Sequence, residues 1–288
     1  MRALPNGENS KRMKRLLILL FAWLPVAAAA QSVQDSLAIA AIRWDTCCLR
    51  PHLVAVQAQL ELFGAPQTIS MVKYKSGRYC TRIVQPDSLT CTSTLAKAEN
   101  AVAAVNAGYF NVKRFVPSTF VRVDGQTLAA TEEQELFRVN GVVAVKGRRV
   151  RIEPYAPTDD DRLAERYPDV LAAGPLLLSE GAVLSYADRK GGFWGRHPRS
   201  LVGVTRRGEV AMIVVDGRFP TQAAGMTIGE LAYLAQQLGL YSALNLDGGG
   251  SSTLWCEAQG VVNYPSDNRQ FDHAGQRRVT NCITVTRK

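Results

Sequence analysis

Short apolar runs recur along most of the chain and predict a structure rich in β-strands. Many of these apolar runs are short, and several alternate apolar with polar residues, as strands do. The intervals 64–66, 146–148 and 206–208 are short and contain glycine, which favours hairpin connections. We assign strands to residues 53–63, 68–74, 102–105, 141–145, 150–152, 201–205, 209–215, 243–246, 253–256 and 282–286.

Helical periodicity is clearest in residues 227–239. Thr227 and Glu230 have the spacing of a capping box, and Gly239 provides a stop signal. A second helix is expected within 89–99, and the polar segment 159–167 is interpreted as a solvated loop or the start of a helix. The mixture predicts an α+β fold, with a single domain built on a large mixed or mainly antiparallel sheet and a few packed helices. The apolar positions of the clearest helix are Ile228, Leu231, Leu234, Ala235 and Leu238.

The N-terminal segment has the layout of a secretory signal peptide. Residues 11–15 are basic apart from Met13, residues 16–24 form an apolar run, and 26–30 end in an Ala-x-Ala pattern before Gln31. The run is too short to span a bilayer, which takes about 20 residues. We therefore predict a signal peptide over 1–30, a catalytic domain over 31–288 and a secreted or periplasmic protein. An uncleaved N-terminal anchor is the alternative, and no later segment predicts a membrane span.

The net charge of +9 does not indicate a nucleic-acid partner. It comes from 34 Lys and Arg against 25 Asp and Glu. Removing residues 1–30 takes away five basic residues and one acidic residue and leaves a net charge of +5. The remaining basic residues are spread along the chain rather than arranged in a stripe. The sequence predicts no particular oligomeric state.

Six cysteines follow the predicted signal peptide. An even number in an exported protein suggests disulfides, and six cysteines allow 15 connectivities. Cys80 and Cys91 could close a short loop, with a stabilisation of roughly 3 kcal/mol. Cys256 and Cys282 lie in two apolar segments that could be neighbours. Zinc is disfavoured because the chain has no Cys-x-x-Cys motif and only three histidines. The remaining two cysteines are Cys47 and Cys48.

Three short polar segments stand at the ends of predicted strands. Residues 106–110, with the sequence Asn-Ala-Gly-Tyr-Phe, follow the strand 102–105, and Arg199 with Ser200 precedes the strand 201–205. Asp216-Gly217-Arg218 ends the strand 209–215 and places a carboxylate beside a guanidinium group. Arginine can contact phosphate or carboxylate with two donors. Taken singly, each segment also fits an ordinary turn or a surface arginine.

The fourth segment, residues 245–252, is the most specific. Asn245 and Asp247 point to the same face of their strand. The glycines 248–250 let main-chain N–H groups approach an anion, and Ser251 follows them. No lysine follows, so this is not a Walker P-loop, and the chain has no Gly-x-Ser-x-Gly elbow. A phosphate-binding loop is therefore favoured over a flexible linker.

Together these segments resemble the phosphodiester glycosidase family, over residues 36–286. Ser200 stands where the family usually has threonine and keeps the hydroxyl group. No single motif is specific, but the ordered set is. The matching landmarks are 106–110, 197–200 with Gly203, 215–218, 225–227 with 230–232, 245–253, Val262-Asn263, Pro265-Ser266, and Gly275-x-Arg277-x-Val279.

The resemblance implies hydrolysis of a sugar-1-phosphate diester of the N-acetylhexosamine type at the anomeric carbon. Asp247 is the expected nucleophile or general base, and Asp216 its electrostatic or acid–base partner. Arg199 would stabilise the departing phosphate. Glu230 is a third candidate carboxylate, although its capping-box role competes. The expected substrate-binding residues are Asn106, Tyr109, Ser200, Gly217, Arg218, Asn245, Gly248, Gly249, Gly250, Ser251 and Arg277.

The expected partner is a phosphorylated glycan or glycopolymer. No cofactor is implied, although Asp216 or Asp247 could hold a divalent cation. Two other functions remain open at this stage. A non-catalytic glycan- or phosphate-binding module would keep Arg199 and the glycine loop without needing the clustered carboxylates. A metal-dependent phosphoesterase would cleave the phosphorus–oxygen bond instead.

Overall fold

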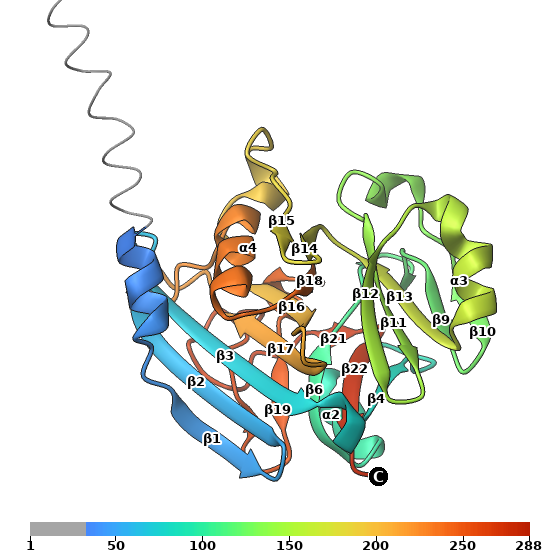
Figure 1. Ribbon diagram of the computed structural model, residues 1–288, viewed down its shortest axis with the longest axis horizontal. Coiled ribbons are helices and arrows are strands. Elements are labelled where there is room, and N and C mark those ends of the chain that lie inside the picture. The colour runs from blue at the N-terminus through green and yellow to red at the C-terminus, as the bar shows by residue number, and fades with distance from the viewer. Residues whose placement is uncertain (1–32) are drawn as a thin grey trace, which may run out of the picture. The chain divides into compact units, whose positions relative to one another are not determined.

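The predicted strands form three antiparallel sheets, which confirms the α+β class (Figure 1). The computed structural model describes residues 33–288. Every pairing between its strands is antiparallel, so the sheet is not mixed. In spatial order, the eight-stranded sheet contains β1 (Asp45–Arg50), β2 (Leu53–Leu62), β3 (Ala65–Lys75), β17 (Glu209–Val215), β16 (Arg199–Val204), β18 (Ser242–Asn245), β14 (Leu176–Ser179) and β15 (Ala182–Val183).

Two five-stranded sheets and two short strand pairs complete the β structure. The second sheet has the order β10 (Gln126–Ala129), β9 (Val121–Val123), β13 (Asp169–Ala173), β11 (Gly141–Lys146) and β12 (Arg149–Pro154). The third has the order β20 (Gly260–Val261), β19 (Leu254–Cys256), β6 (Ala101–Asn106), β22 (Cys282–Thr286) and β4 (Cys80–Val84). The short pairs are β21 (Arg278–Val279) with β5 (Thr90–Cys91), and β7 (Phe110–Asn111) with β8 (Val116–Pro117).

The turn between β2 and β3 is tighter than the sequence suggested. Phe63 and Gly64 have positive φ values of 55° and 68° and form a two-residue connection. Such turns match the twist of the flanking strands. Strand β3 therefore begins at Ala65, three residues before the predicted start at Thr68.

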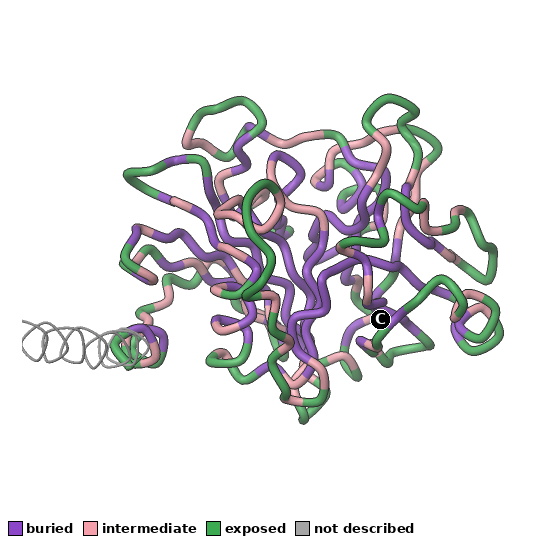
Figure 2. Tube along the Cα trace, turned by 90° about the horizontal axis from the view of Figure 1, so that it is seen from above, coloured by how far each residue is buried: buried purple, intermediate pink, exposed green. Residues whose placement is uncertain are grey.

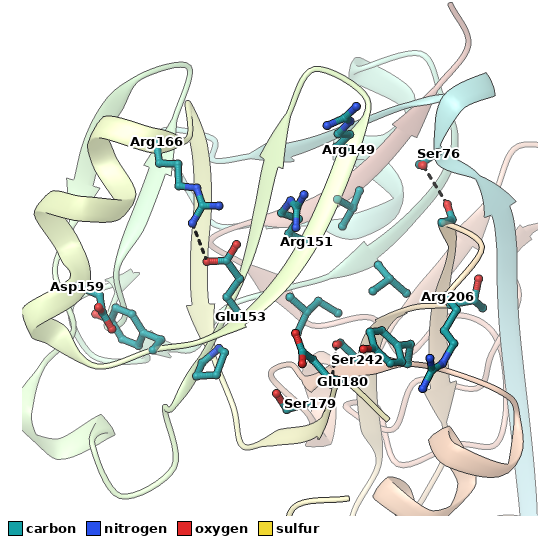
Figure 3. Close-up of a pocket in the computed structure, with 18 of the residues that line it drawn as sticks. Ser76, Arg149, Arg151, Glu153, Asp159, Arg166, Ser179, Glu180, Arg206 and Ser242 are labelled. Carbon is teal, nitrogen blue, oxygen red and sulfur yellow. Dashed lines mark hydrogen bonds and ion pairs between the residues drawn. The ribbon is translucent and has the colours of Figure 1, made fainter. Parts of the chain in front are cut away.

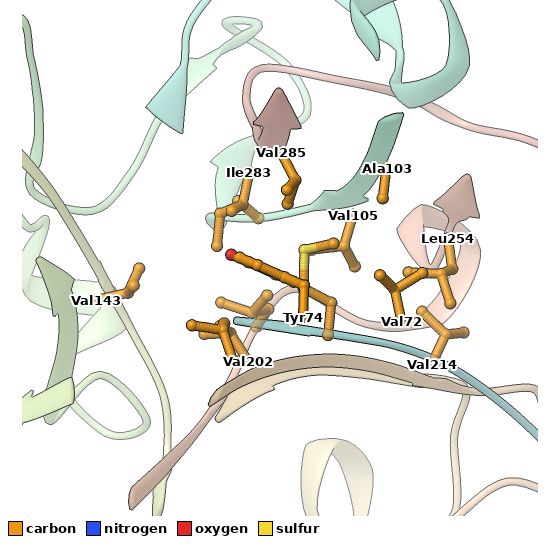
Figure 4. Close-up of a cluster of buried hydrophobic side chains, with 14 of the residues drawn as sticks. Val72, Tyr74, Ala103, Val105, Val143, Val202, Val214, Leu254, Ile283 and Val285 are labelled. Atoms are coloured by element: carbon orange, nitrogen blue, oxygen red, sulfur yellow. The ribbon is translucent and has the colours of Figure 1, made fainter. Parts of the chain in front are cut away.

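One apolar core joins the three sheets (Figure 4). Val202 comes from the eight-stranded sheet, Val143 from the second sheet and Ile283 from the third, and all three side chains are fully buried. Tyr74 reaches into the same cluster, where its hydroxyl group lies 2.7 Å from the Thr81 hydroxyl. Figure 2 shows the strands buried along most of their length, with exposure concentrated in the connections. The sheets therefore supply a rigid base for the loops at their ends.

Helices are short and cover the sheets from outside. Helix α4 packs against β14 and β18, and α2 packs against β6. The polar segment at 159–167 does start a helix, α3, whose Leu163 is fully buried in a cluster with Tyr167. The helices are α2 (Thr92–Ala98), α3 (Asp160–Arg166) and α4 (Ile228–Gln237), with 3-10 turns η1 (Ser76–Arg78), η2 (Glu133–Glu135), η3 (Pro157–Asp159), η4 (Gly192–Trp194) and η5 (Gly249–Ser251).

The chain divides into two units at residue 42. The described part of the first unit is a helix over 33–40 followed by a turn, and Ile42–Lys288 forms the second. The predicted signal peptide, residues 1–30, lies outside the described residues, and the domain start at residue 31 stays a prediction. Within 33–288, no helix has the length and apolar character needed to cross a bilayer.

The six cysteines, all within the described part of the chain, are free thiols. Cys256 pairs with Ala103 on one side of β6, whereas Cys282 pairs with Asn106 on the other side. Two strand spacings of about 4.8 Å and three residues of about 3.3 Å separate their Cα atoms by roughly 14 Å. A disulfide needs less than about 7 Å. The expected proximity of this pair is therefore wrong, and the Cys80–Cys91 disulfide is not confirmed.

The capping box of α4 is confirmed. The Thr227 hydroxyl accepts from the Glu230 main-chain N–H at 3.2 Å, and the Glu230 carboxylate accepts from the Thr227 N–H at 2.9 Å. These two bonds satisfy donors that the first turn of a helix leaves without partners.

We expect Thr227→Ala to lower the free energy of unfolding by about 1 kcal/mol, because the helix loses its N-cap acceptor. Urea denaturation measures this change. Gln236→Ala, in the last turn of the same helix, is the matched control and should stay within about 0.5 kcal/mol of the unsubstituted protein. Equal losses in the two variants would contradict the capping role.

Candidate active site

The polar segments meet at one edge of the eight-stranded sheet. Strands β17 and β18 both pair antiparallel with β16, so their carboxyl ends lie beside the start of β16. Arg199 is opposite Val215, and Leu201 is opposite Asn245. Asp216 follows Val215, and Asp247 lies two residues beyond Asn245. The tertiary structure therefore brings the two predicted carboxylates to the same edge, with Cα atoms about 10 Å apart from two strand spacings.

The Asn106 side chain joins this edge to the third sheet. Its Nδ2 donates to the main-chain oxygen of Asp247 at 2.6 Å. Its Oδ1 accepts from the Ser200 hydroxyl at 2.8 Å and from the Thr253 N–H at 3.0 Å. Asn106, Ser200 and Thr253 are fully buried, so these bonds compensate the cost of removing their polar atoms from water. In the structure, Asn106 and Ser200 thus position the segment that contains Asp247, and their predicted substrate contacts stay predictions.

Tyr109 and Asn245 form a second buried network. The Tyr109 hydroxyl donates to the Gly174 oxygen at 2.5 Å. Asn245 Nδ2 donates to the same oxygen at 2.7 Å and to the Leu246 oxygen at 2.9 Å. Asn245 Oδ1 is buried with no hydrogen-bond partner in the described structure. Burial raises the pKa of Tyr109 well above its ordinary value, so the hydroxyl stays protonated and remains a donor.

The glycine loop packs closely against neighbouring main chain and side chains. A Cβ on Gly248 would lie 2.6 Å from the Pro198 oxygen, and the Gly249 N–H donates to that oxygen at 2.9 Å. A Cβ on Gly250 would lie 2.6 Å from Arg277 Nη2. Gly217 makes a similar close approach, because its Cβ would lie 2.6 Å from the Pro198 nitrogen. Gly248 and Gly217 approach main-chain atoms of Pro198, so glycine is required sterically at these two positions, whereas Gly250 approaches the flexible end of the Arg277 side chain.

Two guanidinium groups lie against the glycine loop. Arg218 Nη2 is 3.0 Å from the position that a Cβ on Gly249 would occupy. Arg218 itself has a positive φ of 72° and an exposed side chain. Arg277 pairs with Asp267, with Nη2 to Oδ1 at 2.5 Å. The structure thus brings two predicted anion-binding arginines to the loop that follows Asp247.

Asp247 is partly exposed at the centre of this group. Desolvation raises the pKa of its carboxyl group to about 6, opposed by the Ser251 hydroxyl, Arg138, Arg277 and the Gly248 N–H. A carboxyl group with such a pKa is largely ionised at neutral pH yet close enough to titrate. Of the predicted carboxylates, Asp247 combines solvent access with nearby positive charge.

Sequence reasoning missed Arg138. Its guanidinium group lies 3.8 Å from the Tyr109 ring centroid and pairs with the buried Glu135 at 2.6 Å. Glu135 is held in turn by the Ser118 hydroxyl at 2.9 Å. Arg138 also lowers the pKa of Asp247 through its charge. It follows a 3-10 turn outside the four polar segments, so no local motif marked it.

Asp216 is almost fully buried behind the exposed surface. Its Oδ1 accepts from Asn263 Nδ2 at 2.8 Å and from the Tyr264 N–H at 3.0 Å, while Oδ2 is buried without a partner in the described structure. Desolvation raises its pKa to about 7 despite these bonds. Asn263 also donates to the Ser252 oxygen at 3.1 Å, which links Asp216 to the end of the glycine loop. Asn263 belongs to the C-terminal landmarks but was not among the predicted site residues.

Arg199 and Glu230 are engaged in internal contacts. Arg199 is 2% exposed, and its guanidinium group donates to the main-chain oxygens of Met226, Phe193 and Gly195 at 2.9, 2.7 and 2.6 Å. Glu230 caps α4 and pairs with Arg196 at 2.6 Å. The structure gives both side chains positioning roles for the chain around β16. Their predicted catalytic roles stay predictions.

The described side chains do not form a typical metal site. Within residues 33–288, no group of three His, Cys, Asp or Glu side chains lies close enough together to hold a metal ion. The unpartnered Asp216 Oδ2 is an available oxygen ligand, but in the described structure it belongs to no such group of three.

The pKa of Asp216 predicts a pH-dependent stability. The unfolded carboxyl group ionises near pH 3.8 and the folded one near 7, so the folded state binds the proton more tightly between these values. The stabilisation is present below pH 3.8 and is lost as pH rises to 7, with a total on the order of 4 kcal/mol. We expect Asp216→Asn, which mimics the neutral form, to remove this dependence. Urea titrations at pH 4, 5.5 and 7 measure it.

The matched control is Asp188→Asn, at a carboxylate whose side chain is 82% exposed. The difference in unfolding free energy between this control and the unsubstituted protein should hardly change with pH. For Asp216→Asn, the difference in unfolding free energy from the unsubstituted protein should change with pH. A constant difference at the three pH values would show that folding does not raise the pKa of Asp216.

Comparisons with known proteins identify a family and a shared fold. A family model described as phosphodiester glycosidase matches residues 99–286. Curated relatives named N-acetylglucosamine-1-phosphodiester alpha-N-acetylglucosaminidase include those of Bos taurus, 36% identical over 89 residues, and Homo sapiens, 33% identical over 72 residues. These alignments cover 30% and 25% of this chain and only 16% and 13% of the relatives. The chain therefore matches a small part of those proteins.

Solved structures share the fold at lower identity. The zebrafish N-acetylglucosamine-1-phosphodiester alpha-N-acetylglucosaminidase catalytic domain, auto-inhibited by its pro-peptide, has a TM-score of 0.65 at 18% identity, covering 86% of this chain and 89% of that one. A putative exported protein of Burkholderia pseudomallei has a TM-score of 0.59 at 16% identity, covering 78% and 75%. The family model spans well over half of the sequence, so the chain belongs to the phosphodiester glycosidase family.

Proposed function

We propose that this protein is an exported glycosidase that hydrolyses a sugar-1-phosphate diester at the anomeric carbon. The observation that carries the proposal is the grouping of Asp247 with the glycine loop and two arginines. Asp247 is partly exposed, and Arg218 and Arg277 lie against the main chain of Gly249 and Gly250. A carboxylate beside a positively charged, main-chain-lined surface suits a reaction that separates a sugar cation from a phosphate anion.

The leaving group determines what the site must supply. Cleavage of the bond between the anomeric carbon and oxygen releases a phosphate monoester, which carries the bonding electron pair. This group is already stable as an anion, so it needs positive charge more than a proton. Arg218 can supply that charge because its guanidinium group has no carboxylate partner in the described part of the chain. Arg277 contributes less, since Asp267 neutralises part of its charge.

Asp247 would act on the sugar carbon. As a nucleophile, its carboxylate oxygen would bond to the anomeric carbon while the phosphate leaves, and water would then cleave the glycosyl ester. As a general base, it would remove a proton from the attacking water. Asp216 is nearly inaccessible, which suits an electrostatic or acid–base partner acting through Asn263 and the end of the glycine loop.

The sugar is proposed to be an N-acetylhexosamine, and the substrate a phosphorylated glycan or glycopolymer. The names of the curated relatives support this choice, since they specify N-acetylglucosamine-1-phosphodiester. The basic, apolar and Ala-x-Ala order of residues 11–30 supports export to the periplasm or the medium. The substrate therefore lies outside the cytoplasm in this proposal.

Asp247→Asn tests the assigned carboxylate. We expect kcat/KM for the methyl diester of N-acetylglucosamine 1-phosphate to fall by roughly 10³-fold, because the amide neither attacks carbon nor takes a proton. In the unsubstituted protein, the raised pKa predicts that kcat/KM rises with pH through about 6 as Asp247 ionises. Release of methyl phosphate is the measurement.

Asp161→Asn is the control for the loss of kcat/KM in Asp247→Asn. Asp161 is exposed on α3 and makes none of the contacts described for the candidate active site. Its kcat/KM should match that of the unsubstituted protein. Near-normal turnover in Asp247→Asn would exclude the proposed role. If the unsubstituted protein binds the diester without turnover, the proposed hydrolysis is wrong and the protein is a binding module.

The position of bond cleavage distinguishes a glycosidase from a phosphoesterase. Hydrolysis in water enriched in oxygen-18 should place the label in the released N-acetylglucosamine, because water attacks the anomeric carbon. Mass spectrometry of both products measures it. Label in the phosphate product would show cleavage at phosphorus and overturn the proposal in favour of a phosphoesterase.

A further inference from the structure

A cavity lies away from the candidate active site. It has a volume of about 930 Å³ and opens between β12 of the second sheet and the β16–β18 side of the eight-stranded sheet. In Figure 3, Arg149, Arg151 and Glu153 lie on β12, while Arg206 and Ser242 lie across the cavity from them. The cavity is therefore a cleft between two sheets that share a core.

This cleft and the candidate active site are at opposite ends of the same strands. Ser242, at the start of β18, lines the cleft, whereas Asp247 follows the end of β18. Five residues of extended chain separate them by about 16 Å. In the same way, Val204 at the end of β16 lines the cleft, and Arg199 begins that strand near the active site. The cleft cannot hold the reacting bond, but a chain molecule could contact both regions.

The cleft has an excess of unpaired positive charge. Arg162 pairs with Asp159 at 3.1 Å, and Arg162 and Arg166 each lie 3.7 Å from Glu153. Within residues 33–288, the other three lining arginines have no carboxylate partner, and Glu180 is the remaining acid. These exposed side chains are Arg149, Arg151 and Arg206.

The positive charge continues beyond both ends of the cleft. A hollow of about 430 Å³ shares Arg149, Arg151 and Arg166 with it and adds Lys146. A second hollow, of about 460 Å³, shares Arg206 and adds Arg207. Neighbouring hollows share lining residues, so the three hollows adjoin one another, and we call them together the basic groove. Arg149 and Arg151 point to the same side of β12, about 7 Å apart along the strand. This arrangement matches a ligand with repeated negative charges rather than a single anion.

The aromatic residues of the groove argue against nucleic acid. Single-stranded nucleic acids bind proteins largely by stacking bases on open aromatic faces. Tyr155 and Tyr167 are 6% and 5% exposed, with Tyr155 stacked on Phe120. The Arg206 guanidinium lies 4.4 Å from the ring centroid of Tyr241 and covers it. Two of these lining rings are buried and Arg206 covers one face of the third, so a sugar-based polyanion is the better match.

We propose that this groove binds a polyanionic glycan chain with phosphate groups at regular intervals, through Arg149, Arg151 and Arg206. The inference rests on the proposed function in one respect, because it takes the ligand to be a longer form of the diester substrate. Phosphates outside the reacting unit would contact these arginines and hold the polymer on the enzyme. The groove thereby favours polymeric over single-unit substrates.

The test variant is Arg149→Gln/Arg151→Gln/Arg206→Gln. The probe is a linear polymer of N-acetylglucosamine units joined through 1-phosphodiester bonds, and inorganic polyphosphate serves as a second probe without sugar. We expect the variant to bind both probes roughly tenfold more weakly at 0.1 M salt, since each exposed charge contact contributes about 0.5 kcal/mol. Its kcat/KM for the single-unit methyl diester should be unchanged.

The matched control removes three positive charges outside the groove, with Arg43→Gln/Lys97→Gln/Lys288→Gln. It has the same net charge as the test variant and should retain polymer binding. Arg149→Lys/Arg151→Lys/Arg206→Lys keeps the charge and should restore most of the affinity. Equal loss in the test and control variants would show a general charge effect and overturn the groove assignment. Tighter binding of single-stranded RNA than of the phosphoglycan would overturn the proposed ligand class.

The experiments distinguish an error in the groove proposal from an error in the proposed function. If the unsubstituted protein cleaves the single-unit diester but the test variant binds the polymer normally, only the groove proposal is wrong. If no diester is cleaved while the test variant still loses polyphosphate binding, the groove proposal holds and the glycosidase proposal is wrong. Circular dichroism and thermal denaturation confirm that each variant is folded.

Discussion

The buried amide of Asn106 connects the parts on which the candidate site depends. It bonds to the Asp247 main chain, the Ser200 hydroxyl and the Thr253 N–H, so one side chain ties β6, β16 and both ends of the glycine-loop segment together. Leaving any of these groups unpaired in the protein interior would cost about 1–3 kcal/mol. The main-chain position of Asp247 therefore depends on the satisfaction of these buried hydrogen bonds.

Two carboxylates at the same sheet edge have different surroundings. Asp247 is partly exposed and interacts with the charges of Arg138 and Arg277, whereas Asp216 is enclosed and receives its hydrogen bonds from Asn263 and the Tyr264 main chain. Burial raises the pKa of both, to about 6 and about 7. Different environments allow two carboxyl groups to take different roles in acid–base catalysis. This supports assigning the direct role to Asp247 in the proposed reaction.

Positive charge gathers at both ends of β16 and β18, with different consequences. Near Asp247, the arginines are held against glycine main chain or by a carboxylate, which suits a defined position for one phosphate. In the basic groove, the unpaired arginines are exposed along a cleft between two sheets. Exposed charges bind a chain weakly at each contact and depend on several contacts together. The proposed division is therefore between positioning the reacting group and retaining a longer substrate.

The sequence by itself determined the local features. Alternating apolar residues specified most strands, Thr227 and Glu230 specified the start of α4, and glycine marked the turns and the loop after Asp247. These features depend on neighbouring residues, so they are visible in a linear sequence. The ordered motifs also identified the family, which the family model matches over residues 99–286.

Only the tertiary structure decided which residues meet. It divided the strands among three sheets, kept Cys256 apart from Cys282, and brought Arg138 beside Tyr109 from outside every motif. It also turned Arg199 inward onto main-chain oxygens and engaged Glu230 with Arg196. Strand order, burial and the partners of a charged group depend on contacts between distant segments. A single sequence records the types of residues available for those contacts, but the packing of the sheets selects which of them form.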